Sequence, residues 1–231
     1  EVRAQSTATT DPAAQTTTTA APATAPAAAT DPAALALKAG DAQKANMAQL
    51  QTYRWRVKTD MQSAGVSKAN VVKEIGFDAQ GKITATPISG ETTEEQKRGL
   101  RGRSQEKEMS ELADYLGKVT QQSLAYMYMS KGTLVDMFEK ATITTEGDAT
   151  KVTAKDVYMK GDTVVMTLDS ATMLTRHLTF TSLMGADAIN GDVTYAALKD
   201  GTVRVTNSTI DVPAKGAKII SESFDFVKPE N

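Results

Sequence analysis

Residues 53–62, Tyr-Arg-Trp-Arg-Val-Lys-Thr-Asp-Met-Gln, decide the fold class because two kinds of side chain alternate along them. Tyr53, Trp55 and Val57 belong to a mainly apolar set, and the residues between them are charged. A period of two is typical of a β-strand with one face in the core and the other in water. We therefore predict a strand here whose inner face buries Trp55.

Two more strands are predicted on the C-terminal side. Segment 69–77 alternates in the same way. Its predicted inner face consists of Ala69, Val71, Ile75 and Phe77. The turn residues 78–81, Asp-Ala-Gln-Gly, connect it to a third strand over residues 82–88. Pro87 cannot donate a ladder hydrogen bond, so the third strand should end there or lie at a sheet edge. The three segments predict an antiparallel meander.

Helical spacing replaces the alternation between residues 104 and 129. Apolar side chains recur there every three or four residues, which is the period of an amphipathic helix. The predicted apolar face includes Met109, Leu112, Leu116 and Val119. A short helix capped by Thr133 should follow and carry Met137 and Phe138.

A further helix is predicted before the first strand. Asp31 suits its N-cap and Pro32 its first turn. Gly40 and Asp41 are expected to break this helix, which leaves a second helical piece over residues 42–51.

From residue 141 onward the pattern is again that of strands, interrupted by turn signals. These signals are Glu146-Gly147-Asp148, Lys160-Gly161-Asp162, Asn190-Gly191-Asp192 and Lys199-Asp200-Gly201. They predict strands near residues 151–159, 163–171, 173–184, 192–199, 202–212 and 217–228. Separate groups of helices and antiparallel strands define an α+β fold. We expect a strongly curved antiparallel sheet of about nine strands, an open half-barrel, with the helices packed on its concave side.

Residues 5–34 differ in composition, with 12 Ala, 9 Thr and 4 Pro. So few large apolar side chains cannot offset the backbone entropy lost on folding. We expect residues 1–34 to form a disordered tether and residues 35–231 a single folded domain. Val2-Arg3-Ala4 resembles the end of a signal peptide, which favours a periplasmic or secreted protein of the bacterial envelope. The alternative is that residues 1–4 have no such origin.

Charge and composition argue against several classes of function. Once the first 34 residues are set aside, 25 basic and 25 acidic residues remain, so no net field favours nucleic acid or an anionic membrane surface. No apolar run approaches the roughly 18 residues that cross a bilayer. The chain has no Cys and 1 His, which excludes multi-histidine metal sites. We predict no cofactor, no metal and no catalytic residue, and we interpret His177 as a surface strand residue.

Several stretches resemble a group of uncharacterised exported bacterial proteins, over about residues 45–228. These stretches are 49–56, 77–82, 86–89, 99–103 and 161–163, together with Leu168-Asp169 and Thr172. The predicted element order is in turn similar to that of the LolA and LppX group of periplasmic lipoprotein and lipid carriers, in which an open barrel and a helical lid enclose an apolar cavity. The resemblance implies a carrier, and it transfers no functional residue to this chain. The lack of Cys differs from the lipid-anchored members.

The leading hypothesis is a non-enzymatic binding protein that buries an apolar or lipid-like ligand between sheet and helical lid. The predicted pocket lining consists of Tyr53, Trp55, Val57, Met109, Leu112, Leu116, Val119, Met137 and Phe138. The second hypothesis is a structural or adaptor module of the envelope with a filled core. The third is an enzyme that uses carboxylates alone, which need no local motif. We expect a monomer, with a protein partner in the envelope left open.

Overall fold

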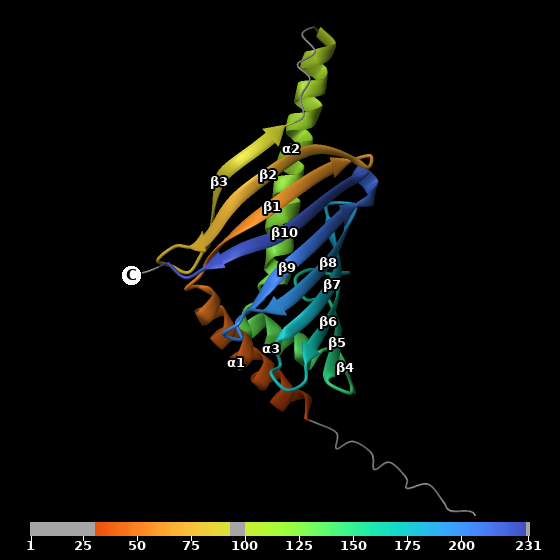
Figure 1. The fold of residues 1–231 in the computed structure, drawn as a ribbon. Coiled ribbons are helices and arrows are strands. Elements are labelled where there is room, and N and C mark those ends of the chain that lie inside the picture. Colours follow the sequence, from red (N-terminus) through yellow and green to blue (C-terminus); the bar gives the residue numbers. More distant parts are fainter. Residues whose placement is uncertain (1–30, 93–99, 230–231) are drawn as a thin grey trace, which may run out of the picture.

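The computed structural model describes residues 31–92 and 100–229, with side chains described for 31–89, 107 and 110–229. These residues form three α-helices and a ten-stranded sheet (Figure 1). The helices are α1 (Pro32–Leu50), α2 (Leu100–Met127) and α3 (Lys131–Glu139). The strands are β1 (Arg54–Ser63), β2 (Val66–Phe77), β3 (Ile83–Thr92), β4 (Thr142–Glu146), β5 (Ala149–Lys155), β6 (Thr163–Asp169), β7 (Thr175–Met184), β8 (Asp187–Ala197), β9 (Val203–Val212) and β10 (Ala217–Val227). Residues 1–30 of the predicted tether lie outside the described residues, and the last residues of that segment belong to α1.

The strands form one open antiparallel sheet in the order β3-β2-β1-β10-β9-β8-β7-β6-β5-β4. The predicted meander is confirmed as β1, β2 and β3, and β3 with its Pro87 is an edge strand. The sheet has ten strands rather than about nine because residues 142–146 form an additional hairpin partner for β5. β1 pairs with the C-terminal β10, so the two halves of the chain meet in the middle of the sheet.

Helix α1 begins as predicted, but it does not break. The Asp31 carboxylate accepts a hydrogen bond from the backbone N–H of Ala33 at 3.0 Å, and Pro32 occupies the first turn. The helix continues through Gly40 because α1 packs against α3 there. A Cβ at residue 40 would lie 3.0 Å from Cγ of Lys131, so the glycine permits a close helix contact. The predicted break was therefore wrong.

The short helix α3 begins earlier than predicted. Its N-cap is Ser130, whose hydroxyl accepts a hydrogen bond from the backbone N–H of Thr133 at 3.1 Å. Thr133 was therefore wrongly assigned as the cap, because two hydroxyl residues lie close together here and either type suits the position. The helix buries Leu134, Met137 and Phe138.

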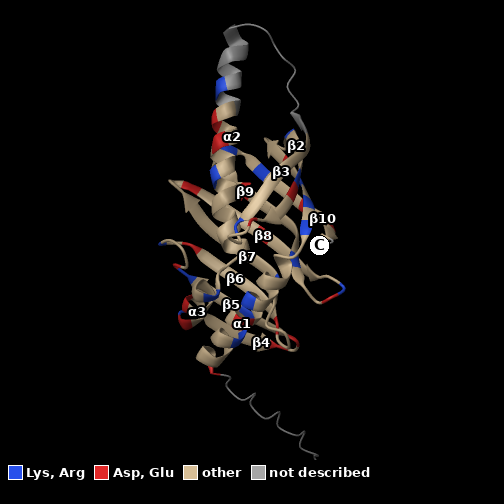
Figure 2. Ribbon diagram, turned by 90° about the vertical axis from the view of Figure 1, so that its left-hand side faces the viewer, with Lys and Arg blue, Asp and Glu red and all other residues tan. Residues whose placement is uncertain are grey.

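The core lies between the concave side of the sheet and helices α2 and α3. Figure 1 shows α2 running along that side and extending beyond the sheet. Leu116 and Val119 of α2 are buried, together with apolar residues of β5 to β10. Among the described residues, charges of both signs are scattered over helices and strands (Figure 2). No helix of the described residues has the length and apolar character to cross a membrane.

The predicted turn at Asn190-Gly191-Asp192 was wrong, since these residues lie inside β8. Gly191 pairs directly with Phe180 of β7. A Cβ at residue 191 would lie 2.1 Å from Cε1 of Phe180, whose ring stacks on Tyr126 of α2 with centroids 4.3 Å apart. The glycine leaves room for an aromatic ring to lie across the neighbouring strand.

We predict that Gly191→Ala lowers the free energy of unfolding by at least about 1–3 kcal/mol, because the new methyl group overpacks the Phe180 site. Urea denaturation measures the loss. Gly117→Ala in α2 is the matched control, since nothing lies within 4 Å of a Cβ there, and it should stabilise the helix. Equal stability of Gly191→Ala and the wild-type protein would contradict the described packing.

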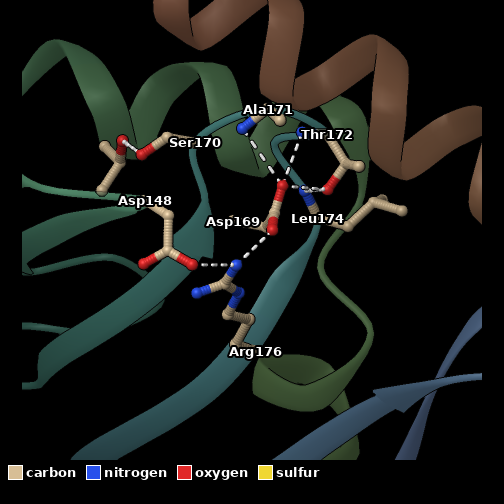
Figure 3. A network of polar contacts seen from close by, with 8 residues as sticks. Asp148, Asp169, Ser170, Ala171, Thr172, Leu174 and Arg176 are labelled. Carbon is tan, nitrogen blue, oxygen red and sulfur yellow. Dashed lines mark hydrogen bonds and ion pairs between the residues drawn. The ribbon is translucent and has the colours of Figure 1, made fainter.

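The turn between β6 and β7 is held by Asp169 (Figure 3). One oxygen of its carboxylate accepts hydrogen bonds from the backbone N–H groups of Ala171 and Thr172 at 3.1 and 2.7 Å. The other oxygen pairs with Arg176, which also contacts Asp148 at 2.8 Å. These bonds support Met173, which has φ +58° and is buried. The network therefore has a structural role.

The bonds from Thr172, together with Arg176, lower the pKa of Asp169 to about 2. A carboxyl group whose pKa is depressed on folding stabilises the protein above its ordinary pKa, and this contribution is lost as the pH falls through the folded value. We predict that Asp169→Asn is less stable than wild type at neutral pH, and that the difference closes between about pH 4 and pH 2. Denaturation midpoints measured across this range test it. A constant difference would contradict the assignment.

Candidate functional site

A cavity of about 160 Å³ lies between α2 and the part of the sheet formed by β1, β2, β3, β9 and β10. Its apolar lining includes Trp55, Val57, Ile75, Leu124, Met127 and Ile210. The β-strand residues reach it because their side chains point to the concave face, and the α2 residues because they recur at three- and four-residue spacing. A cavity of about this volume holds one benzene molecule in an engineered protein.

A polar minority also lines the cavity. Thr59, Ser221 and Ser208 lie opposite one another on β1, β10 and β9. The hydroxyls of Thr59 and Ser221 are 3.1 Å apart and share a hydrogen bond. Among the residues that the structure describes, Lys73 of β2 is the only charged one in the lining. The cavity is therefore mainly apolar, with hydroxyl groups on its sheet side and one cation.

Helix α2 is fixed to the opposite part of the sheet by a polar latch formed by Gln122, Tyr126, Asp162 and Ser182. The Tyr126 hydroxyl lies 2.8 Å from Oδ2 of Asp162 and 2.9 Å from Oγ of Ser182. Gln122 donates to Oγ of Ser182 at 2.8 Å. Burial raises the pKa of Tyr126, so its hydroxyl stays protonated as a hydrogen-bond donor. The latch holds α2 against β7 and the loop 156–162.

Two more tyrosines bond α2 to β8. Tyr115 donates to Oδ2 of Asp187 at 3.0 Å, and burial together with this carboxylate raises its pKa to about 12. Tyr195 donates to the carbonyl oxygen of Met127 at 2.9 Å. Among the described side chains, those of residues 31–89, 107 and 110–229, no hydrogen bond joins α2 to β1, β2 or β3. On that side the cavity lies between the helix and the sheet.

The structure brings two of the predicted pocket residues, Trp55 and Val57, to the cavity. Tyr53 lies elsewhere, because its hydroxyl donates to Oδ2 of Asp200 at 2.7 Å and Lys228 lies 4.8 Å from its ring centroid. That predicted contact therefore does not line the described cavity.

The other predicted residues belong to helices. Leu116, Val119, Met137 and Phe138 are buried in the core, and Leu112 packs against it. Met109 lies on α2, but its side chain is outside the described ones. The stripe of α2 that faces the cavity is instead Thr120, Ser123, Leu124 and Met127. Core and cavity thus share the broad apolar side of one helix.

Lys73 was missed, although the alternation of β2 places it between Val71 and Ile75 on the inner face. The sequence does contain a signal for it, since Lys73 is a charged residue at a position where the alternating pattern predicts an apolar one. Its partner on β1 is Val57, which confirms the inward register. His177, by contrast, is partly exposed, and its Nε2 lies 3.0 Å from Oδ1 of Asp192. The described residues contain no group of three or more His, Cys, Asp or Glu placed to hold a metal ion.

Comparison with solved structures finds chains of similar architecture. A DUF1329 family protein from Desulfovibrio piger is 11% identical, with 86% of this chain and 94% of that chain covered and a TM-score of 0.38. A domain of an outer membrane lipoprotein-sorting protein from Vibrio parahaemolyticus is 10% identical, with 84% and 92% covered and a TM-score of 0.40. A LolA superfamily protein from Nitrosomonas europaea is 7% identical, with 82% and 94% covered and a TM-score of 0.36.

No protein-family profile matches the chain, and no curated protein sequence matches it. The LolA group, which the predicted element order resembles, is among the solved structures found. At these identities and TM-scores the matches carry no argument about this chain, so the function must rest on its own residues.

Proposed function

We propose that this protein is an exported, non-enzymatic binding protein that takes the apolar part of a lipid-like ligand between α2 and strands β1 to β3. The observation that carries the proposal is the mainly apolar cavity on the side of α2 where the described side chains form no polar latch. A helix held by hydrogen bonds along one flank can move away from the sheet along the other. Ligand burial would then stabilise the complex by about 25 cal/mol per Å² of apolar surface.

The size of the cavity favours the second candidate, an envelope adaptor with a filled core. A volume of about 160 Å³ is below the roughly 300–1,000 Å³ of ordinary small-molecule pockets. A carrier therefore has to widen the cavity on binding, whereas an adaptor has no need to. Ligand binding by the native protein distinguishes the two.

The experiment is a titration of the native protein with an environment-sensitive apolar dye, 1-anilinonaphthalene-8-sulfonate. We expect dye binding with the far-UV circular dichroism unchanged, and weaker binding by Ser208→Phe, which fills the cavity. Thr209→Phe is the matched control, because residue 209 is next on β9 and lines a hollow on the convex face. Dye binding only on unfolding would overturn the proposal in favour of the adaptor.

Native mass spectrometry of freshly purified protein gives an independent result. The proposal predicts a co-purified species whose mass fits a single lipid-like molecule, and its loss in Ser208→Phe. Retention of the same species by Ser208→Phe and its loss in Thr209→Phe would place the binding site on the convex face and overturn the assignment to this cavity.

A further inference from the structure

We infer that the ligand is an amphiphile with one unbranched apolar chain and one anionic head group, and that Lys73 holds the head. The inference rests on the proposed function and specifies its ligand. It starts from the position of Lys73, the only charged residue among the described residues of the cavity lining.

Lys73 occupies an inward position on β2. It pairs with Val57, and the next inward residue, Ile75, pairs with Trp55. The neighbouring acid, Glu74, points to the other face of the strand and lies 3.7 Å from Arg54. None of the ion pairs among the described side chains includes Lys73. Lys73 is a half-buried residue beside apolar side chains. Because no described side chain supplies its countercharge, an anionic ligand could supply it.

The ends of the cavity differ in exposure, and this sets the direction of the ligand. At the end near β9 and β10, Ile210 and Ile219 are buried. At the other end, Lys73 is half-buried and Ala85 of the edge strand β3 is exposed. An apolar chain therefore enters toward Ile210, and the head stays near solvent beside Lys73. This is the usual arrangement of an amphipathic group at an apolar surface.

Charge and volume limit the ligand further. One lysine balances one negative charge, so the lining favours a carboxylate over a phosphate monoester, which carries nearly two charges at neutral pH, and over a head with several charges. A volume of about 160 Å³ admits the end of a single chain before the helix moves. A neutral apolar ligand would use the same cavity without Lys73, and the test below separates the two cases.

The test compares dodecanoate with dodecanol, which have the same chain length and differ in charge. Binding is followed by the fluorescence of Trp55, the single tryptophan, which lines the cavity. We expect the native protein to bind dodecanoate at least about tenfold more tightly, the effect of one charge-assisted contact. Lys73→Gln should lose this preference and keep its affinity for dodecanol. Lys73→Arg should again prefer dodecanoate, because arginine keeps the positive charge.

Lys58→Gln is the matched control, because Lys58 is an exposed lysine on the neighbouring strand β1. It should keep the preference for dodecanoate. Denaturation midpoints check that all variants fold. Equal binding of dodecanoate and dodecanol by the native protein, or an undiminished preference in Lys73→Gln, would overturn the inference and leave the proposed function standing. Binding of neither ligand would overturn the proposed function itself. Monododecyl phosphate in place of dodecanoate then tells which anionic head is preferred.

Discussion

Asp162→Ala should lower the free energy of unfolding by more than about 3 kcal/mol, because one buried and three partly buried donors lose their acceptor at once. Oδ1 of Asp162 accepts from the backbone N–H of Val157 at 2.7 Å, and Oδ2 accepts from those of Tyr158 and Met159 at 2.9 and 3.2 Å. The Tyr126 hydroxyl adds a fourth contact. Each unpaired buried donor costs about 1–3 kcal/mol. Urea denaturation monitored by circular dichroism measures the total.

Two variants sharpen this test. Asp162→Asn keeps one acceptor oxygen but places an NH2 group, which cannot accept, beside backbone N–H donors. Its free energy of unfolding should therefore fall by less than that of Asp162→Ala. Asp156→Asn is the control in the same loop, since Asp156 is exposed, accepts from the Gly161 N–H at 2.6 Å and has φ +55°, which Asn tolerates. A loss below about 1 kcal/mol in Asp162→Ala would show that water replaces the carboxylate.

The role of Asp162 also illustrates what a sequence pattern leaves out. Lys160-Gly161-Asp162 was interpreted as a turn signal, and a turn is present there. The same aspartate, however, is only 1% exposed and bonds to a helix far away in the chain. Turn propensity depends on neighbouring residues, whereas a buried polar contact depends on tertiary packing. Sequence reasoning could therefore predict the turn but not the latch.

Gly191 shows the same distinction more sharply. A glycine between Asn and Asp is locally typical of a turn, and the prediction of a turn was wrong. The residue is needed because Phe180 occupies the space where a side chain would lie. The strand pattern of residues 53–62 succeeded for the opposite reason, since alternation directly reports which face of β1 is buried. Trp55, the residue on which that prediction depended, is 3% exposed.

The cavity was predictable only in part. The sequence placed Trp55 and Val57 on the inner face, and both line the cavity. The rotation of α2 could not be predicted, because Leu116 and Leu124 lie on the same broad apolar side of the helix. Polar contacts of Gln122 and Tyr126 with the sheet determine which of these residues face the core and which face the cavity. Such contacts have no local sequence signature.

Trp55→Ala should lower the free energy of unfolding by about 3–5 kcal/mol, the usual cost of removing a large buried aromatic side chain. The indole ring stacks on the ring of Phe226, with centroids 5.4 Å apart. It also contacts the tilted ring of Phe77, with centroids 5.8 Å apart. Arg204 in turn lies 4.3 Å from the centroid of Phe226, which extends the stack toward β9. Removing the indole merges its volume with the neighbouring cavity, so the variant should also gain space for a ligand. Urea denaturation measures the loss.

Added indole then separates the two roles of Trp55. Because a ligand that binds only the folded state raises stability by mass action, indole should restore part of the loss in Trp55→Ala by occupying the enlarged cavity. Phe138→Ala is the matched control, since Phe138 is 1% exposed but lies on α3 and does not line the cavity. Its loss should be similar, and indole, which exceeds the volume of a phenyl ring, should not restore it. Equal rescue of both variants would show a nonspecific effect of indole. If Trp55→Ala lowered the free energy of unfolding by less than about 1 kcal/mol, the indole ring would line the cavity without contributing to the core.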